Sequence, residues 1–226
     1  MKTYRYLDLI TAAFVAVLII SNVAAAKVVV LGPFTFDGGT LLFPLAYIFG
    51  DVLTEVYGYA RSRRVIWTGF ALLALASLTF SAVAALPALQ DPGVAPYARA
   101  FDLLFGLVPR IVLGSLLAYW AGEFTNSYVL AKMKVWSRGR FFGLRAVGST
   151  LFGEAVDTGL FLLVAFAFVY PWPVIGVMFA SNYVFKVGVE VVFLPLTTAF
   201  VVWLKRAEDE DCFDTHTDFN PFRLGG

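Results

Sequence analysis

Six long apolar stretches constrain this chain more than any other feature of its sequence. A helix that crosses the hydrocarbon core of a bilayer needs roughly 20 mostly apolar residues. Stretches of about this length lie at residues 6–30, 41–58, 65–87, 101–124, 146–170 and 174–204. The composition agrees, because 60% of the 226 residues are hydrophobic and 15% are charged, whereas soluble domains have about 25% charged residues. We therefore expect an all-α, polytopic membrane protein with six transmembrane helices.

The distribution of Lys and Arg predicts how these helices are oriented. Cytoplasmic loops of membrane proteins carry an excess of both residues. If the N-terminus lies in the cytoplasm, nearly all of the 17 Lys and Arg residues fall in cytoplasmic segments. The four exceptions are Lys27, Arg99, Arg110 and Lys186. An even number of helices returns the C-terminus to the same side, so we expect both termini in the cytoplasm.

The chain divides into a transmembrane domain, residues 1–207, and an acidic cytoplasmic tail, residues 208–226, which we expect to be disordered because it is polar and charged. The single histidine, His216, and the single cysteine, Cys212, both lie in this tail. P-loop, GxSxG, HExxH and CxxC motifs are absent from the sequence. We therefore expect a protein that is no enzyme and uses no cofactor or metal. A net charge of +1 gives no reason to expect binding to nucleic acid.

Charged residues inside the apolar stretches are the candidates for function. A charge at the centre of a bilayer costs several kcal/mol, so it needs a partner or a water-lined cavity. The acids are Asp51, Glu55, Glu123, Glu154, Asp157 and Glu190, and the bases are Lys27, Arg110 and Lys186. Six acids minus three bases leaves three acids that protons, a cation or the donor groups of a substrate must balance.

Helical spacing places some of these acids on shared faces. Asp51 and Glu55 are four residues apart, and Glu154 and Asp157 are three apart, so each pair points from one face of its helix. The second pair lies toward the middle of its stretch, which favours a functional role. Glu55 lies near a cytoplasmic loop, so the alternative to a functional role is that it lies at a helix end and reaches water.

The remaining charges have structural alternatives. Lys186 and Glu190 are four residues apart and could neutralise each other. Arg110 stays charged and could hold a carboxylate from another helix. Glu123 lies close to the predicted end of its stretch and reads as a boundary residue, and Lys27 could extend to the outer surface.

Two asparagines within the apolar stretches have two interpretations. Asn22 and Asn182 both follow a serine, and each offers a donor and an acceptor. They could join helices by hydrogen bonds, or they could read the edge of a planar heterocycle.

One internal similarity links the second and fifth stretches. The segment FGDVLTEV at 49–56 resembles FGEAVDTG at 152–159. A second pair, SNVAAAK at 21–27 and SNYVFK at 181–186, lies on the first and sixth stretches, so the related segments occur in reversed order in the two halves of the chain, which does not fit a tandem repeat. We interpret the similarity as convergence of two helices on one central site.

Several motifs in order resemble the queuosine precursor transporters, a group of small bacterial inner-membrane proteins of six helices. They are SNVAAAK (21–27), FTFDGGTLLFP (34–44), GDVLTEVYG (50–58) and FGEAVDTGLF (152–161), followed by Asn182, Lys186 and Glu190. The resemblance covers nearly the whole chain except the acidic tail. It implies uptake of 7-cyano- or 7-aminomethyl-7-deazaguanine, and an arrangement of helices similar to the substrate-binding subunits of energy-coupling-factor vitamin importers.

The residues and the resemblance together give a site hypothesis. Glu154, Asp157 and Asp51 would lie nearest the ligand, with Asn22, Glu55, Asn182, Lys186 and Glu190 completing the substrate-binding set and Lys27 and Arg110 balancing charge. The alternatives are a substrate-capture subunit that needs an ATPase partner, for which Ala12 and Ala16 offer a small-residue packing surface, and an intramembrane enzyme. The expected partners are the deazaguanine and the lipid bilayer. The spacing leaves a homodimer, the preferred deazaguanine and any ion coupling undecided.

Overall fold

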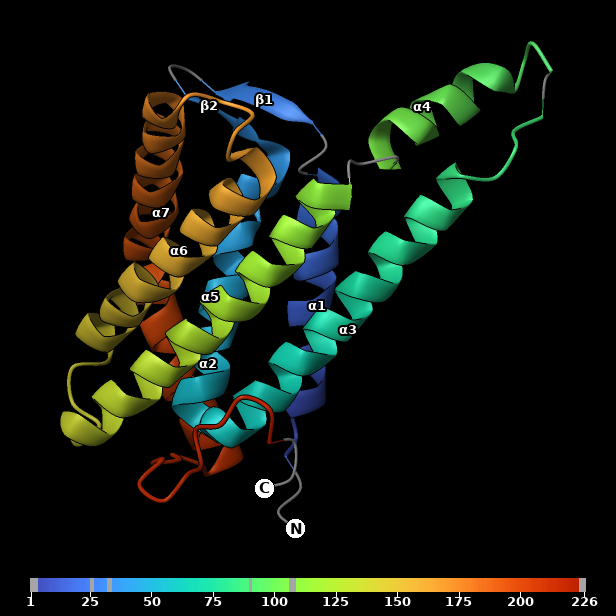
Figure 1. Cartoon of the computed structure of the whole chain (residues 1–226). Helices are drawn as coiled ribbons and strands as arrows, with labels where there is room; N and C mark the ends of the chain where they lie inside the picture. Colours follow the sequence, from blue (N-terminus) through green and yellow to red (C-terminus); the bar gives the residue numbers. More distant parts are fainter. Residues whose placement is uncertain (1–3, 25–26, 32–33, 90, 106–108, 224–226) are drawn as a thin grey trace.

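The computed structural model describes residues 4–24, 27–31, 34–89, 91–105 and 109–223 (Figure 1). Its elements are α1 (Leu7–Ala24), β1 (Val28–Leu31), β2 (Phe34–Asp37), the 3-10 helix η1 (Gly38–Leu41), α2 (Phe43–Tyr57), α3 (Tyr59–Ala84), α4 (Ala95–Phe105), α5 (Pro109–Trp136), α6 (Phe142–Phe166) and α7 (Trp172–Glu208). The protein is therefore α-helical with one short antiparallel hairpin, in which Val28 pairs with Asp37 and Leu31 with Phe34.

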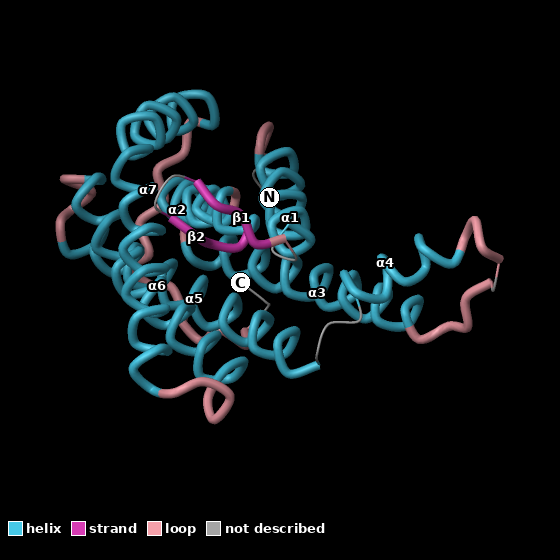
Figure 2. The backbone as a smooth tube through the Cα atoms, turned by 90° about the horizontal axis from the view of Figure 1, so that it is seen from above, coloured by secondary structure: helices cyan, strands magenta, loops and turns pink. Residues whose placement is uncertain are grey.

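The helices form a bundle with two distinct ends (Figure 1). The start of α1 and the end of α7 lie together, because the backbone N–H of Tyr6 donates a 2.7 Å hydrogen bond to Glu208. We call this the terminal end. The β1–β2 hairpin covers the opposite end above α2 (Figure 2), and we call this the hairpin end. α3 leans away from the bundle toward α4, which has no buried residue.

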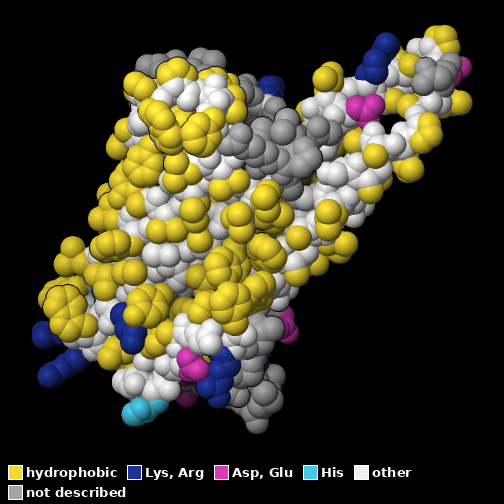
Figure 3. Space-filling model, viewed as in Figure 1, with side chains coloured by type: hydrophobic (Ala, Val, Ile, Leu, Met, Phe, Trp, Pro, Cys, Tyr) yellow, Lys and Arg dark blue, Asp and Glu magenta, His cyan; other side chains and the backbone are white. Residues whose placement is uncertain are grey.

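The surface is that of a membrane protein. Hydrophobic side chains cover the face shown in Figure 3, and Lys and Arg gather toward the terminal end. Large apolar side chains are exposed on the long helices, such as Leu78 on α3, Leu144 on α6 and Val192 on α7. Among the described residues, four helices, α1, α3, α6 and α7, are long and apolar enough to cross a membrane. This arrangement suits a hydrocarbon surrounding, in which exposed apolar groups carry no penalty.

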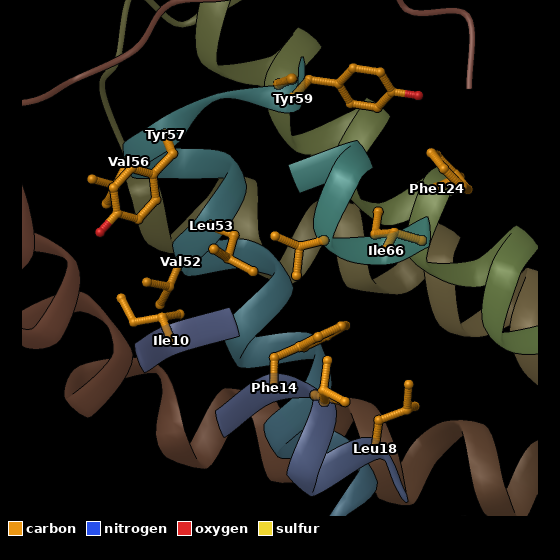
Figure 4. Close-up of a cluster of buried hydrophobic side chains, with 14 of the residues drawn as sticks. Ile10, Phe14, Leu18, Val52, Leu53, Val56, Tyr57, Tyr59, Ile66 and Phe124 are labelled. Carbon is orange, nitrogen blue, oxygen red and sulfur yellow. The ribbon is translucent and has the colours of Figure 1, made fainter. Parts of the chain in front are cut away.

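α2 is the central helix of the bundle. Every residue from Gly50 to Tyr57 is buried, so this helix meets protein on all sides. A buried apolar cluster joins its Val52, Leu53 and Val56 to Phe14 of α1 and to Ile66 of α3 (Figure 4). At its end, Gly58 adopts φ 84°, a conformation that glycine tolerates and that lets the chain turn directly into α3.

The predicted bounds of the fourth span, 101–124, are wrong. Residues 101–105 end the short helix α4, and α5 begins only at Pro109 and continues to Trp136. Proline fits the first turn of a helix because its missing N–H has no intrahelical partner there. The predicted first span is also too long, since α1 ends at Ala24 and residues 28–31 form a strand.

The tail differs from the expected disordered segment. Residues 209–223 lie across the terminal end and bind the helices through backbone groups. The guanidinium of Arg63 donates to the carbonyl oxygens of Asp218 and Asn220 at 2.8 and 2.7 Å, and the indole of Trp67 donates to that of Pro221 at 2.7 Å. Both aromatic residues and acids of the tail take part in this packing, since the backbone N–H of Tyr59 also donates a 3.0 Å hydrogen bond to Asp214. Phe219 lies 4.9 Å from the ring of Tyr59.

Candidate functional site

Five carboxyl groups from four helices meet inside the bundle. They are Asp51 of α2, Glu123 of α5, Glu154 and Asp157 of α6, and Glu190 of α7. Each residue is at most 4% exposed. Electrostatic interactions link Glu123 to Glu154, Asp157 and Glu190, and they link Asp51 to Glu190 and Glu123. We call these five residues the central acidic cluster.

Lys186 is the one cation that the described side chains place in this cluster. Its Nζ lies 3.0 Å from Oε2 of Glu154, 2.7 Å from Oδ2 of Asp157 and 4.4 Å from the centre of the Phe43 ring. The lysine therefore binds the two acids of α6 rather than Glu190, its neighbour one turn along α7. One lysine offsets only part of the charge that five carboxylates would carry, so protons or a bound group must balance the rest.

The cluster contains many polar atoms with no hydrogen-bond partner. Among the described residues these include both carboxylate oxygens of Glu123, both of Glu190 and Oδ2 of Asp51. The hydroxyl of Tyr47, Oδ1 of Asn126 and Oγ1 of Thr150 are also buried without a partner. Buried polar groups in proteins are normally satisfied, and an unsatisfied one is costly where no bulk water is near. These atoms are therefore available to a ligand or to bound water.

Three glycines let the helices bring these groups together. A Cβ atom on Gly50 would lie 2.7 Å from Oε2 of Glu123, and one on Gly122 would lie 2.7 Å from the Tyr47 hydroxyl. A Cβ atom on Gly153 would lie 2.8 Å from Cβ of Asn126. Side chains at these positions would push α2 and α6 away from α5.

The two similar sequence segments flank α5 within this site. Gly50-Asp51 of α2 approaches it beside Glu123, and Gly153-Glu154 of α6 approaches it beside Asn126. The geometry agrees with our interpretation that both segments converge on one centre. In each case a glycine allows the close approach, and the acid after it joins the cluster.

Sequence reasoning missed part of this site. The predicted span ends at 124, which makes Glu123 a residue at the membrane boundary, whereas α5 places it near the middle of a longer helix. Asn126 follows one turn later, and its Nδ2 donates a 2.7 Å hydrogen bond to Oδ1 of Asp51. The spacing of Glu123 and Asn126, three residues apart on one helical face, was the available signal. Tyr47 and Thr150 gave no signal of their own.

Glu55 lies in a separate ionic cluster at the terminal end. Its carboxylate is fully buried and forms a two-point ion pair with the guanidinium of Arg145. It also accepts a 2.6 Å hydrogen bond from Lys205, and its backbone carbonyl accepts a 2.5 Å bond from Lys134. We call Glu55, Lys134, Arg145, Lys205 and Asp211 the terminal ionic cluster. It joins α2, α5, α6 and α7 through one carboxylate.

The tail contributes Asp211 to this cluster. Its Oδ1 lies 2.5 Å from Nζ of Lys134 and 2.9 Å from Nζ of Lys205. Partial desolvation raises the pKa of Asp211, but hydrogen bonds from the two lysines outweigh it and hold that pKa below its ordinary value. The tail is thus attached to the same ion pairs that hold the helices together.

Asn22 and Asn182 form hydrogen bonds with other residues. Asn22 joins helices, because its Oδ1 accepts a 3.0 Å hydrogen bond from Ser115 of α5. Nδ2 of Asn182 donates to the carbonyl of Met178 in its own helix at 3.0 Å. Lys27 is exposed beside the hairpin. The side chain of Arg110 lies outside the described residues.

All five acids of the central acidic cluster are buried. Among the described residues, no group of three or more His, Cys, Asp or Glu side chains has an arrangement that could hold a metal ion. The unpartnered carboxylate oxygens of the cluster can accept hydrogen bonds from a group rich in donors.

Comparison with known proteins agrees with this picture. A family model described as "Putative vitamin uptake transporter" matches residues 37–200. A Bacillus subtilis protein named "Probable queuosine precursor transporter" is 33% identical over 79% of this chain and 77% of its own. An Escherichia coli protein named "Queuosine precursor transporter" is 27% identical over 92% of this chain and 94% of its own. No solved structure gives a significant match.

The match to the family model includes all of α2, α5 and α6 and most of α7, the four helices that supply the central acidic cluster, and the relatives extend over most of the chain. They are transporters rather than enzymes, in agreement with the absence of catalytic motifs. The chain therefore belongs to the family of membrane transporters described as vitamin uptake transporters.

Proposed function

We propose that this protein imports the queuosine precursors 7-cyano- and 7-aminomethyl-7-deazaguanine across the inner membrane of a bacterium. The names of the two relatives support the substrate. The observation that carries the proposal is the set of unpartnered carboxylate oxygens beside Lys186, buried within a bundle whose outer surface is apolar.

The chemistry of the substrate fits this set. A guanine-like ring presents adjacent N–H donors on one edge, and a carboxylate accepts such a pair in a two-point hydrogen bond. The ring carbonyl suits a donor such as Lys186 or Tyr47. The aminomethyl group is cationic near neutral pH and would offset part of the excess negative charge. Stacking of the ring on an aromatic face such as Phe43 would add about 1–3 kcal/mol.

The proposal assigns the substrate to the central acidic cluster. Asp51, Glu154, Asp157, Lys186 and Glu190 are kept from the sequence hypothesis as binding residues. Asn22, Asn182 and Glu55 instead have helix-joining or local partners. Transport would alternate exposure of the cluster to the two sides of the membrane through movement of the helices around α2.

The proposed topology has six spans with both termini in the cytoplasm. α1, α3, α6 and α7 are long and apolar enough to span alone. The short α2, which is buried within the bundle, and the more polar α5, which packs against α2, α3 and α6, would complete the six. The Lys and Arg residues at the terminal end support a cytoplasmic location. We also propose that the helices are arranged like those of energy-coupling-factor substrate-binding subunits and that the protein forms a homodimer.

Uptake of labelled 7-aminomethyl-7-deazaguanine into liposomes that contain the purified chain tests the proposal. We expect uptake by the wild-type chain without an ATPase, and its loss in Glu154→Gln and Asp157→Asn. Asp102→Asn is the matched control, since Asp102 is an exposed acid on α4. Uptake that required an ATPase partner would favour the substrate-capture alternative, and normal uptake in both cluster variants would contradict the site.

A further inference from the structure

Glu123 differs from Asp51, Glu154 and Asp157 in the central acidic cluster. Glu154 and Asp157 share Lys186, and Asp51 accepts a hydrogen bond from Asn126. Glu123 is fully buried, and both of its carboxylate oxygens lack a hydrogen-bond partner in the described part of the chain. A carboxylate kept dry and unpaired at this position is costly to the fold, which points to a role in binding.

The surroundings of Glu123 are built to accept several donors at once. Asn126 lies three residues later on the same face of α5 and has a free Oδ1, and Asp51 has a free Oδ2. The absence of a side chain at Gly50 leaves the space that Oε2 of Glu123 occupies. Two oxygens of Glu123 and these two further oxygens form a group of four acceptors.

This group of four acceptors fits one kind of ligand edge. A 2-amino-lactam ring, as in guanine, presents three N–H bonds side by side: one from the ring nitrogen and two from the exocyclic amine. A carboxylate takes the ring N–H and one amine N–H in a two-point bond, and a neighbouring amide or carboxylate oxygen takes the third. Glu190 also has two free oxygens, but no unpartnered amide oxygen follows it on its own helix in the described structure.

We propose that Glu123 is the specificity-determining residue that reads the 2-amino-lactam edge of the substrate, with Asn126 and Asp51 accepting the remaining amine hydrogen. This assignment rests on the proposed function, since it refines how a deazaguanine would be recognised. Lys186 with Glu154 and Asp157 would then face the other side of the ring.

The experiment compares binding of 7-cyano-7-deazaguanine with binding of its analogue that lacks the 2-amino group, by titration calorimetry on the detergent-purified full chain. Loss of a hydrogen bond to a charged group reduces affinity about tenfold to 150-fold, so the wild type should prefer the amino compound by this factor. In Glu123→Gln the preference should fall severalfold, because Asn126 and Asp51 still accept one amine hydrogen, while the analogue still binds. Glu123→Asp should retain part of the preference.

A second variant tests the geometry without changing charge. Gly50→Ala places a methyl group 2.7 Å from the present position of Oε2 of Glu123, so it should displace the carboxylate and weaken the same preference. Asp102→Asn, at an exposed acid on α4, is the matched acid-to-amide control and should keep it.

The outcomes separate the two proposals. If the wild type binds the amino compound and Glu123→Gln keeps the full preference, the role of Glu123 is refuted and the transport proposal stands. If the preference is lost in Glu190→Gln instead, the edge is read from α7. If the wild type binds neither compound, the proposed function fails, and the assignment of Glu123 fails with it.

Discussion

Removal of the Glu55 charge should destabilise the protein strongly, because this carboxylate holds the terminal ionic cluster together. The side chain is fully buried and pairs with Arg145 and Lys205, with Lys134 at 3.6 Å. In Glu55→Gln, Lys134 and Lys205 keep Asp211, but Arg145 keeps only the backbone carbonyls of Arg140 and Gly139. Removal of one partner from a buried ion pair costs about 3–5 kcal/mol.

Thermal unfolding of the detergent-purified protein measures this cost. For chains of 150–250 residues, 1 kcal/mol corresponds to about 2–4 °C in melting temperature, so we expect a decrease of roughly 6–20 °C. The control is Arg223→Gln, which breaks an ion pair whose side chains are 63% and 46% exposed and should cost no more than about 1 kcal/mol.

A double variant shows whether the loss comes from the unpaired charge. Arg145→Gln added to Glu55→Gln removes the cation that the first change strands, so it should recover part of the lost stability. If Glu55→Gln melts within the range of the Arg223→Gln control, or if the second change adds a full further loss, the terminal ionic cluster does not join the helices as we describe.

Three further predictions follow from the same contacts. Lys186→Met leaves Glu154 and Asp157 without a counter-ion, so we expect a lower melting temperature and no substrate binding; Asp157→Asn added to it should restore the melting temperature but not binding. Truncation after Glu208 removes the hydrogen bonds that Arg63, Trp67 and Lys134 make to the tail. It should lower the melting temperature by several degrees, at about 2–4 °C per kcal/mol, whereas removal of residues 224–226 should not. Asp211→Asn should lower the stability by about 1 kcal/mol or less, because Asp211 is 46% exposed. Since the folded-state pKa of Asp211 is lowered, the difference in stability between wild type and variant should be full above the ordinary Asp pKa of about 3.9 and should disappear as the pH falls below it. A constant difference in stability down to pH 2 would contradict this.

The sequence predicted the class of the fold because hydrophobic length is a local property. It placed α3, α6 and α7 within a few residues. It misplaced the fourth span because the apolar pattern of residues 101–124 does not separate the end of α4 from the start of α5. That error moved Glu123 from the middle of a helix to its end and removed it from the predicted site.

The partners of the charged residues could not be predicted, because they come from distant parts of the chain. Asp51 and Glu55 share one face of α2, as their spacing predicts, yet one helical turn separates two different clusters. Asp51 meets Asn126, and Glu55 meets Arg145, which lies 90 residues away. Local spacing fixes which face a side chain occupies, and only the packing of α5, α6 and α7 decides what it meets.

Ligand-induced stabilisation of the purified protein tests the central claim most directly, which is that the central acidic cluster binds queuosine precursors. A ligand at 100 times its Kd stabilises the native state by about 2.7 kcal/mol, which corresponds to an increase of about 5–11 °C in melting temperature. We expect this increase with 7-cyano- or 7-aminomethyl-7-deazaguanine, none with a panel of vitamins, and its loss in Glu154→Gln. A shift with a vitamin but none with either deazaguanine would contradict the substrate, and an undiminished shift in Glu154→Gln would contradict the site.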